Sequence, residues 1–248
     1  MTDTPSPSVL ILGASSDIAR PLARLYAEDG YRVILAARQI DRLDADAQDL
    51  RIRHNQSVDL QEFNACDTDQ HVAFLDRLGE LPETVLCLIG LMTPQEEAQT
   101  DFAAAKLMIQ TNYLGLVSIL GEVANRMEQR GSGTIIGVSS VAGDRGRATN
   151  YIYGSAKAGF TAFLSGLRNR LFKKNVLVIT IKPGFIRTRM TEGLDLPNAL
   201  TALPDEMARA IRQAHKKKKL VVYHRPIWRL IMLIICSLPE RIFIRTKF

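Results

Sequence analysis

Val9-Leu10-Ile11-Leu12-Gly13-Ala14-Ser15-Ser16-Asp17-Ile18-Ala19 is the stretch of the chain that decides the fold. Its short apolar run ends at a glycine, a pattern typical of a buried strand followed by a tight turn. Residues 18–29 then have helical spacing, with apolar side chains at Ile18, Leu22 and Leu25 on one face. A strand, a tight turn and a helix in this order predict the start of an α/β fold.

The same alternation continues along the chain. Further strands are predicted at Arg32–Ala37, Asp59–Ala65, Val85–Ile89, Gly133–Val138, Val176–Ile181 and Leu220–Tyr223, with helices that include Phe102–Gln129 and Tyr153–Phe172. Strands that alternate with helices indicate a parallel sheet covered on both faces. We therefore expect a single doubly wound Rossmann fold of class α/β. Residues 1–225 would form this nucleotide-binding domain, which includes the active site, and residues 226–248 a C-terminal apolar and basic tail.

Composition excludes several classes of protein. The 248 residues are 46% hydrophobic and 23% charged, which argues against disorder. Three scattered cysteines, Cys66, Cys87 and Cys236, do not make a disulfide framework and suit a reducing compartment. We predict no metal site. The first eight residues lack the basic segment of a signal peptide, and no run of 18 apolar residues occurs, so a cytoplasmic location is expected.

The net charge of +6 is unevenly distributed. Residues 209–248 carry 11 lysines and arginines and one acid, Glu240, whereas residues 1–208 carry a net charge of −4. A nucleic-acid-binding protein would more often spread its basic residues over the fold. We expect no nucleic-acid partner and look for a separate explanation of the basic C-terminal segment.

The first turn has the composition of a nucleotide-phosphate turn. Gly13 permits a tight bend, and the small residues after it let a pyrophosphate approach the backbone at a helix N-terminus. Ser15, Ser16, Asp17 and Ile18 complete the expected cofactor-binding turn. Asp17 is alternatively a plain helix N-cap.

Arg38 follows the second predicted strand. A carboxylate at that place would bind ribose hydroxyls, whereas an arginine favours a 2′-phosphate. The alternative is a solvated surface arginine.

The strongest chemical signal lies between residues 139 and 157. Ser140 follows the fifth strand, Tyr153 comes 13 residues later, and Lys157 lies one helical turn after Tyr153 on the same face. A nearby ammonium group lowers the pKa of a phenol, so that Tyr153 can exchange a proton with a substrate oxygen. Ser140 would hydrogen bond the same oxygen. The alternative is a core tyrosine with an unrelated lysine.

These residues resemble the short-chain dehydrogenase/reductase family, and the resemblance extends over about residues 8–215. Its most specific part is Ser140 with Tyr153-Gly154-Ser155-Ala156-Lys157. It implies that Asn112 supports a water-mediated proton relay from the lysine. The chain departs from the family pattern at Asp17 and Ala19, which replace glycines, and at Cys87-Leu88-Ile89-Gly90, where the family has Asn-Asn-Ala-Gly.

The resemblance also implies further cofactor contacts. It places Asp67 with Thr68 beside the adenine ring, and Tyr153 and Lys157 beside the nicotinamide ribose. The remaining cofactor-binding positions that it implies are Gly90, Pro183, Gly184, Ile186 and Thr188, of which Ile186 and Thr188 would hold the nicotinamide carboxamide. The expected cofactor is NADPH, with NADH as the alternative.

The activity implied is NAD(P)H-dependent reduction of a ketone to a secondary alcohol. The segments 133–145 and 186–190 and the ending 238–243 look like a bacterial branch that contains the decaprenylphosphoryl-keto-ribose reductase, whose substrate is a polyprenylphosphoryl keto-sugar. The alternatives are reduction of another hydrophobic or lipid ketone, or a non-catalytic nucleotide-sensing or scaffold protein on the same fold. Homo-oligomers are common in the family.

The composition of the C-terminal tail indicates that it binds a further partner, an anionic membrane surface. Its apolar stretch, within residues 226–239, has about 12 residues, too few to span a bilayer. Trp228, Arg229, Arg241 and Arg245 flank it, which is typical of an interfacial helix on an anionic membrane. The protein would then lie peripherally on the inner face of the membrane. The alternative is a core or dimer-interface helix.

Four arginines are candidates for binding a substrate phosphate: Arg145 and Arg147 between Ser140 and Tyr153, or Arg187 and Arg189 after the sixth strand. Ordinary solvated arginines are the alternative.

Overall fold

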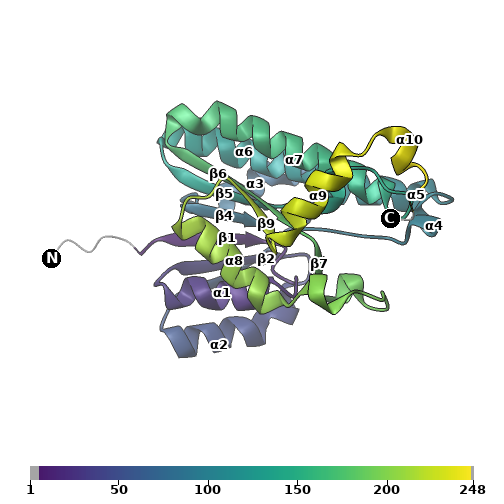
Figure 1. The fold of residues 1–248 in the computed structure, drawn as a ribbon. Helices are drawn as coiled ribbons and strands as arrows, with labels where there is room; N and C mark the ends of the chain where they lie inside the picture. Colours follow the sequence, from purple (N-terminus) through teal and green to yellow (C-terminus); the bar gives the residue numbers. More distant parts are fainter. Residues whose placement is uncertain (1–5, 247–248) are drawn as a thin grey trace.

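A seven-stranded parallel sheet forms the centre of the protein in the computed structural model, which describes residues 6–246 (Figure 1). Its strand order is β3-β2-β1-β4-β5-β6-β9. The strands are β1 (Ser8–Leu12), β2 (Arg32–Ala37), β3 (Val58–Glu62), β4 (Thr84–Cys87), β5 (Gly133–Val138), β6 (Val176–Pro183) and β9 (Val221–His224). Leu10 of β1 pairs with Ile34 of β2 and Val85 of β4. The predicted doubly wound α/β fold is confirmed.

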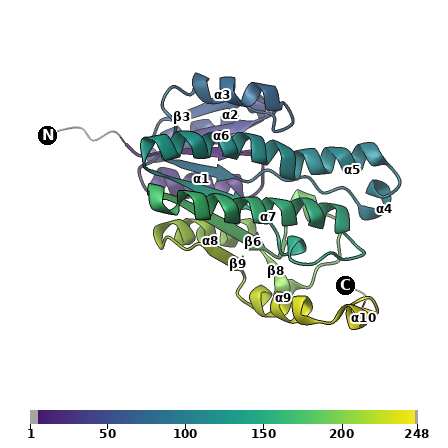
Figure 2. The same cartoon turned by 90° about the horizontal axis from the view of Figure 1, so that it is seen from above.

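Helices cover both faces of the sheet (Figures 1 and 2). On one face lie α1 (Ala19–Glu28), α2 (Asp44–His54) and α8 (Pro204–Lys216); on the other lie α3 (His71–Arg77), α6 (Gly115–Arg130) and α7 (Tyr151–Leu171). The short helices α4 (Gln95–Ala98) and α5 (Phe102–Ile109) precede α6, and α9 (Ile227–Ser237) and α10 (Glu240–Phe243) follow β9. A two-stranded ribbon, β7 (Phe185–Ile186) with β8 (Thr201–Ala202), stands apart from the main sheet.

The alternation of side chains along β1 explains the two hydrophobic cores. Val9 and Ile11 point into the core under α1, α2 and α8, whereas Leu10 and Leu12 point into the core under α3, α6 and α7. All four side chains are fully buried. A strand that is apolar on both faces can only be stable inside such a three-layer structure, which is why the run 9–12 decides the fold.

The predicted helix at 102–129 is longer and less regular than expected. It consists of α5, a single π-helical turn at Gln110–Leu114 and α6. The run Phe102–Arg130 is long and apolar enough to cross a membrane by length and composition alone. Leu116, Ile119 and Leu120 are fully buried against the sheet, as in the core helix of a globular domain.

Some element boundaries differ from the sequence expectation. The third strand ends at Glu62 rather than at residue 65, because the chain turns at Asn64, whose Oδ1 accepts a hydrogen bond from the N–H of Cys66 at 3.2 Å. The helix expected from Tyr153 begins two residues earlier, at Tyr151. The last strand is shifted by one residue, to Val221–His224.

The apolar tail forms helix α9, and one face of this helix packs on the body of the protein. Trp228, Met232 and Ile235 are buried in a small core with Val141 and partly buried Phe185. The opposite face is exposed, with Leu230 at 53%, Leu233 at 64% and Ile234 at 55% exposure. The helix therefore combines a buried face and an unpartnered apolar face.

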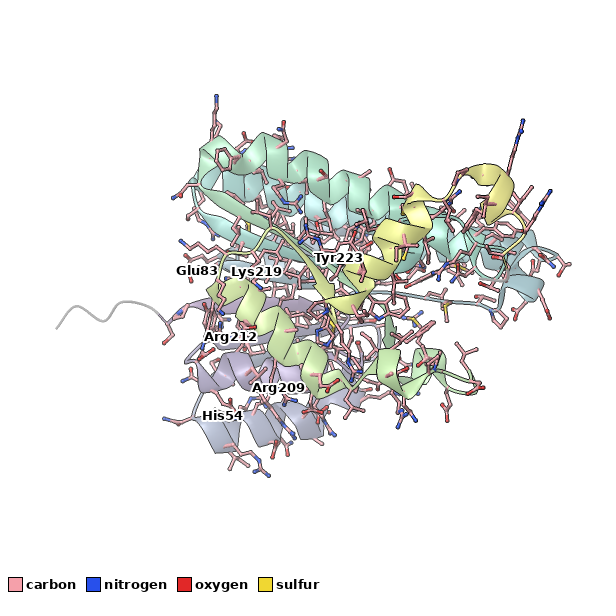
Figure 3. All side chains as sticks on the ribbon, in the orientation of Figure 1. His54, Glu83, Arg209, Arg212, Lys219 and Tyr223 are labelled. Atoms are coloured by element: carbon pink, nitrogen blue, oxygen red, sulfur yellow. The ribbon has the colours of Figure 1, made fainter. Side chains whose placement is uncertain are left out.

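The basic run at residues 216–219 lies away from α9. It precedes β9, whereas α9 follows it, so the two segments are at opposite ends of this strand; Figure 3 labels Lys219 and Tyr223 on the chain segment that joins them. Asp29, at the end of α1, forms ion pairs with Arg212 and, at 3.0 Å, with Lys216. Part of the basic excess therefore holds α8 on α1.

Candidate active site

The predicted site residues gather at one edge of the sheet. In a parallel sheet all strands end at the same edge, and ligands bind where the strand order reverses. Here that point lies between β1 and β4. Gly13 follows β1 and Gly90 follows β4, while Ser140 follows β5.

The turn after β1 is suited to bind an anion. Gly13 has a φ of +85°, and a Cβ there would lie 2.9 Å from the N of Ile89, so only glycine fits. The N–H groups of Gly13 and Ala14 both donate to Ala36 O at 3.0 Å, which fixes the turn. Within residues 6–246, the N–H groups of Ser15 and Asp17 make no hydrogen bond. They are available to a phosphate group at the start of α1, as a dinucleotide requires.

The second half of this turn is held by Arg189, which lies on the loop after β6. The Ser16 hydroxyl accepts a hydrogen bond from the N–H of Ile18 at 3.3 Å, and Ile18 stands at the N-cap position of α1 without a side-chain capping bond. Both carboxylate oxygens of Asp17 accept hydrogen bonds from Arg189, one from its N–H and one from Nε, each at 2.8 Å. The N-cap alternative for Asp17 is therefore not what the structure has.

The residues expected beside the adenosine end are exposed at the same edge. Arg38 directly follows β2, and Asp67 with Thr68 follows β3. The carbonyl oxygen of Asp67 accepts a hydrogen bond from the N–H of Gln70 at 2.9 Å in a short 3₁₀ turn. All three side chains are accessible to a ligand that lies across the strand ends.

Ser140 and Tyr153 meet at the end of β5. Ser140 begins a short 3₁₀ turn, and its hydroxyl accepts a hydrogen bond from the N–H of Ala142 at 3.1 Å. This turn packs directly on α7, since a Cβ on Gly154 would lie 2.7 Å from Ala142 O. The phenol of Tyr153 is buried, which raises its pKa to about 12, and a hydrogen bond with Ser140 opposes this rise. The pair can therefore present a protonated phenol to a substrate oxygen.

Lys157 lies one turn further along α7 and is also buried. Its Nζ donates to the carbonyl oxygens of Val138 at 3.3 Å and Ile89 at 3.4 Å. Burial lowers the pKa of Lys157 to about 8. The expected lowering of the Tyr153 pKa by Lys157 is absent from this structure, because burial of the phenol dominates and Lys157 Nζ lies 5.8 Å from the ring centroid.

Asn112 reaches the same place from the π-helical turn. It is fully buried; its Nδ2 donates to Leu91 O at 2.6 Å and Met108 O at 2.8 Å, and its Oδ1 accepts from the N–H of Leu91 at 3.1 Å. A Cβ on Gly90 would lie 3.5 Å from this Oδ1 and 3.7 Å from Lys157 Nζ. Gly90 thus leaves the space in which Asn112 and Lys157 converge.

The loop after β6 is supported by the C-terminal tail. Pro183 ends β6, and a Cβ on Gly184 would lie 1.9 Å from the indole of Trp228, so the ring lies flat against this glycine. Ile186 is buried in β7, and Thr188 caps the next 3₁₀ turn in a reciprocal arrangement with Thr191. The tail helix therefore positions the loop predicted for the nicotinamide end.

The structure also shows functional neighbours that the sequence did not indicate. Met190 Cε lies 3.3 Å from the position of a Cβ on Gly90, so Met190 borders the space in which Asn112 and Lys157 converge. Trp228 stands out as the single tryptophan, but no sequence pattern links it to Gly184. Only the tertiary fold brings these residues together.

Three of the four candidate phosphate-binding arginines already have protein partners. Arg145 donates to Ile235 O and Leu238 O, pairs with Glu240 and lies over the Phe243 ring, so the tail holds it away from a substrate. Arg187 donates to Asn198 Oδ1, and Arg189 pairs with Asp17. Within the described range 6–246, the buried Nε of Arg147 has no hydrogen-bond partner, and burial lowers its pKa. Arg147 therefore remains as the candidate.

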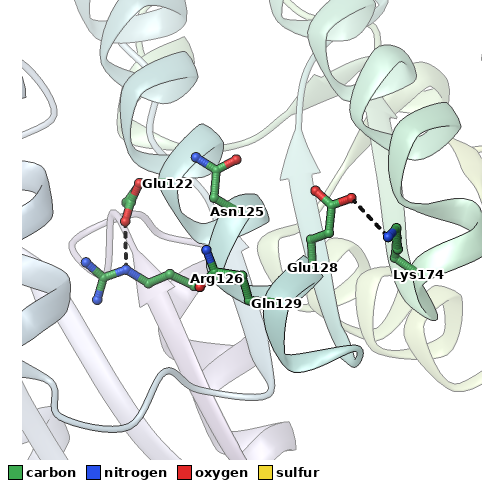
Figure 4. Close-up of a pocket in the computed structure, with 6 residues that line it drawn as sticks. All are labelled: Glu122, Asn125, Arg126, Glu128, Gln129 and Lys174. Atoms are coloured by element: carbon green, nitrogen blue, oxygen red, sulfur yellow. Dashed lines mark hydrogen bonds and ion pairs between the residues drawn. The ribbon is translucent and has the colours of Figure 1, made fainter.

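A surface depression of about 790 Å³ lies far from these residues (Figure 4). Glu122 and Arg126 form an ion pair within it at 2.8 Å, and Glu128 lies 3.9 Å from Lys174. It adjoins the C-terminal halves of α6 and α7, at the edge of the sheet where the parallel strands begin. Its side chains make ordinary solvated ion pairs, and it contains none of the predicted site residues.

Comparison with known proteins agrees with this arrangement. Residues 7–198 match the model of a protein family described as short chain dehydrogenase. An uncharacterized oxidoreductase of Mycobacterium tuberculosis is 38% identical over 227 residues, which cover 90% of each chain. Sulfoacetaldehyde reductase 2 of Chromohalobacter salexigens is 33% identical over 194 residues, 75% of each chain.

The solved structures lead to the same family. A short-chain dehydrogenase from Sphingobium yanoikuyae in complex with NADPH superposes with a TM-score of 0.81 at 25% identity, covering 94% of this chain and 97% of that one. The free N–H groups beside Gly13 and the space at Gly90 fit such a dinucleotide. The chain belongs to the short chain dehydrogenase family, and it is an oxidoreductase that uses a nicotinamide dinucleotide.

Proposed function

We propose that this protein reduces a ketone to a secondary alcohol with NADPH. The observation that carries the proposal is the meeting of the buried Tyr153 phenol with Ser140, one helical turn from Lys157 and across Gly90 from Asn112. A scaffold or nucleotide-sensing protein would need the phosphate turn but not this set.

The protein's own groups would act as follows. Ser140 orients the carbonyl oxygen, and Tyr153 donates the proton that this oxygen takes up, since a phenol with a pKa of about 12 is protonated at neutral pH. Lys157 holds the cofactor ribose and carries a positive charge below pH 8. Asn112 fixes the segment at Leu91, and through it the wall of the cleft. When bound, the nicotinamide ring would supply the hydride.

NADPH is favoured over NADH by Arg38. Its exposed guanidinium follows β2, where the ribose 2′-position of a dinucleotide lies in this fold, and it would bind a 2′-phosphate in a bidentate manner. The neighbour from Sphingobium yanoikuyae, which is in complex with NADPH, supports this choice. Arg38→Ala should raise the KM for NADPH and leave the KM for NADH unchanged.

The direct test is oxidation of NADPH, followed by its absorbance, with a panel of ketones. The panel should include a polyprenylphosphoryl keto-sugar, medium-chain lipid ketones and small water-soluble ketones. Turnover by the wild type and its loss in Tyr153→Phe would support the proposal. Binding of NADPH without turnover of any ketone, or equal turnover by Tyr153→Phe, would contradict it.

The exposed face of α9 favours a substrate carried in a membrane. Leu230, Leu233 and Ile234 form an apolar strip without a partner among the described residues, and exposed arginines at 229, 241 and 245 border it. The one acid of this segment, Glu240, is paired with Arg145. Apolar surface framed by positive charge complements an anionic lipid surface. A lipid-linked keto substrate would then reach the cleft next to α9.

Liposome sedimentation tests this second proposal. A triple variant, Leu230→Ser with Leu233→Ser and Ile234→Ser, leaves the buried face of α9 intact and should abolish pelleting with phosphatidylglycerol vesicles. Ile52→Ser with Phe172→Ser removes equally exposed apolar side chains elsewhere and serves as the control. Equal pelleting of all three proteins would contradict membrane binding, and a concentration-dependent dimer lost in the triple variant would assign the strip to a second copy of the chain.

A further inference from the structure

The phosphate turn of this protein contains a negative charge. Asp17 lies between the free N–H group of Ser15 and the start of α1 at Ala19, where a pyrophosphate would approach. An unpaired carboxylate at this place would repel the phosphates and weaken the attraction of the helix N-terminus for them.

Arg189 compensates for this charge. Its backbone N–H and Nε bind the two carboxylate oxygens of Asp17 at 2.8 Å each, and its Nη2 donates to Ser15 O. The guanidinium therefore lies on the turn itself, in contact with both residues that flank Ser16. The Nε bond to Asp17 is charge-assisted, and the backbone N–H bond beside it fixes the position of the carboxylate.

The same bonds fix a loop across the cleft. Thr191 Oγ1 donates to Ile186 O at 2.6 Å and accepts from the N–H of Thr188 at 3.1 Å, so that residues 186–191 form a compact unit. Met190, next to Arg189, lies beside Gly90 at the opposite end of the cofactor cleft. The loop thus extends from the phosphate turn to the space between Asn112 and Lys157.

We propose that Arg189 is a cofactor-positioning residue: it neutralises Asp17 and latches the 186–191 loop over the pyrophosphate. The inference rests on the proposed use of a nicotinamide dinucleotide but not on the ketone substrate. The two residues act as one unit. Asp17 holds Arg189 in place, and Arg189 neutralises the negative charge that would otherwise repel a phosphate group from the turn.

A double-mutant cycle on cofactor affinity tests the pair, with the dissociation constant measured by quenching of protein fluorescence. Arg189→Ala keeps the backbone N–H bond to Asp17 but leaves its negative charge without the guanidinium, and should raise the Kd for NADPH about tenfold. Asp17→Ala with Arg189→Ala removes the repulsive charge as well and should return the Kd to within about threefold of the wild type. Arg187→Ala, an exposed arginine of the same loop bonded to Asn198, is the matched control and should leave the Kd unchanged.

Comparison of the two dinucleotides separates this effect from the effect of Arg38. Because NADPH and NADH share the pyrophosphate, Arg189→Ala should weaken both by the same factor, whereas Arg38→Ala should weaken NADPH alone. Arg189→Lys keeps the positive charge and the backbone N–H bond, but a single ammonium group cannot reproduce the guanidinium that binds Asp17 and Ser15 together, so its Kd should lie between those of the wild type and Arg189→Ala.

Each result decides one point. A Kd of Arg189→Ala equal to that of Arg187→Ala, or a double variant as weak as Arg189→Ala, would overturn the inference and leave the reductase proposal intact. The expected cycle together with no ketone turnover would overturn the reductase proposal and leave this inference standing. A wild-type protein that binds neither dinucleotide would overturn both.

Discussion

Lys157 Nζ lies 5.8 Å from the centroid of the Tyr153 ring, and its hydrogen bonds go to the carbonyl oxygens of Ile89 and Val138. The ammonium group is thus held by the ends of β4 and β5 rather than by the phenol. The two side chains have opposite pKa shifts from the same cause, since burial disfavours the charged form of each. Before the cofactor binds, the site therefore contains a protonated phenol and a lysine whose ammonium group loses its proton more easily than usual.

The first prediction concerns the proton donor. Tyr153→Phe should lower kcat by at least about 10³-fold, because it removes the proton that the substrate oxygen needs, and should leave the Kd for NADPH within about twofold. Stopped-flow turnover and fluorescence titration measure the two quantities. Tyr151→Phe is the control: Tyr151 lies two residues earlier on α7, is half exposed and hydrogen bonds Gln99. A similar kcat for both variants would exclude Tyr153 as the donor.

The second prediction concerns the pH dependence of stability. The folded pKa of Lys157, about 8, lies below the ordinary value of 10.5, so between these values the unfolded chain binds more protons than the folded one. The free energy of unfolding should therefore rise with pH in this window. Relative to Lys157→Met, the wild type should gain about 2 kcal/mol between about pH 7.5 and 9.5.

Urea unfolding of cofactor-free protein at the two pH values measures this gain. Because the variant retains Tyr153 and Cys87, their titration contributes to both proteins and largely cancels in the difference. Parallel pH profiles for wild type and Lys157→Met would show that Lys157 keeps an ordinary pKa in the folded protein.

A third prediction follows from the packing of Trp228 on Gly184. A methyl group on Gly184 would overlap the indole, with its carbon 1.9 Å from the ring, so Gly184→Ala should destabilise the protein by about 3 kcal/mol or disorder the tail. Gly166→Ala, in the open middle of α7, has nothing within 4 Å of its new methyl and should stabilise by about 0.5–1 kcal/mol. Thermal unfolding compares the two, and equal melting temperatures would contradict the proposed contact.

A fourth prediction concerns Arg145. Its guanidinium binds Ile235 O at 2.5 Å and Leu238 O at 2.7 Å, at the end of α9. Arg145→Ala should leave these carbonyl oxygens unpaired, cost about 1–3 kcal/mol and increase amide hydrogen exchange over residues 235–243. Arg229→Ala removes an exposed positive charge of the same helix and should not alter exchange. Unchanged exchange in Arg145→Ala would mean that the tail is held by its apolar contacts alone.

The sequence predicts most strands of the main sheet and the longest helices of this structure. Apolar runs such as Val9–Leu12 reveal the buried strands because a strand between two helical layers has no polar face. Ser140, Tyr153 and Lys157 are predictable because strand-end position and helical spacing are local properties. The small ribbon β7–β8, with two residues in each strand, is too short for a local signal. Helix α8 is not among the predicted helices, although Pro204 at its start and the apolar positions Met207, Ile211 and Ala214 follow a helical pattern.

Other features depend on contacts between distant parts of the chain. Arg189 and Asp17 are 172 residues apart, so no local pattern could pair them. The π-helical turn that presents Asn112 has no local sequence pattern that distinguishes it from an α-helical turn. The pKa of Tyr153 was expected to fall because of Lys157, but burial, which depends on the packed core, has the larger effect.

The docking of α9 has a consequence for protein synthesis. All proposed catalytic residues precede residue 158, but the indole that backs the Gly184 loop and the helix that clamps Arg145 belong to residues 228–240. A nascent chain can assemble strands β1 to β6 while this segment is still inside the ribosome, since folding begins before translation ends. The loop over the cofactor cleft would gain its support only after residues 228–240 have left the ribosome. The enzyme would therefore remain inactive until helix α9 has docked.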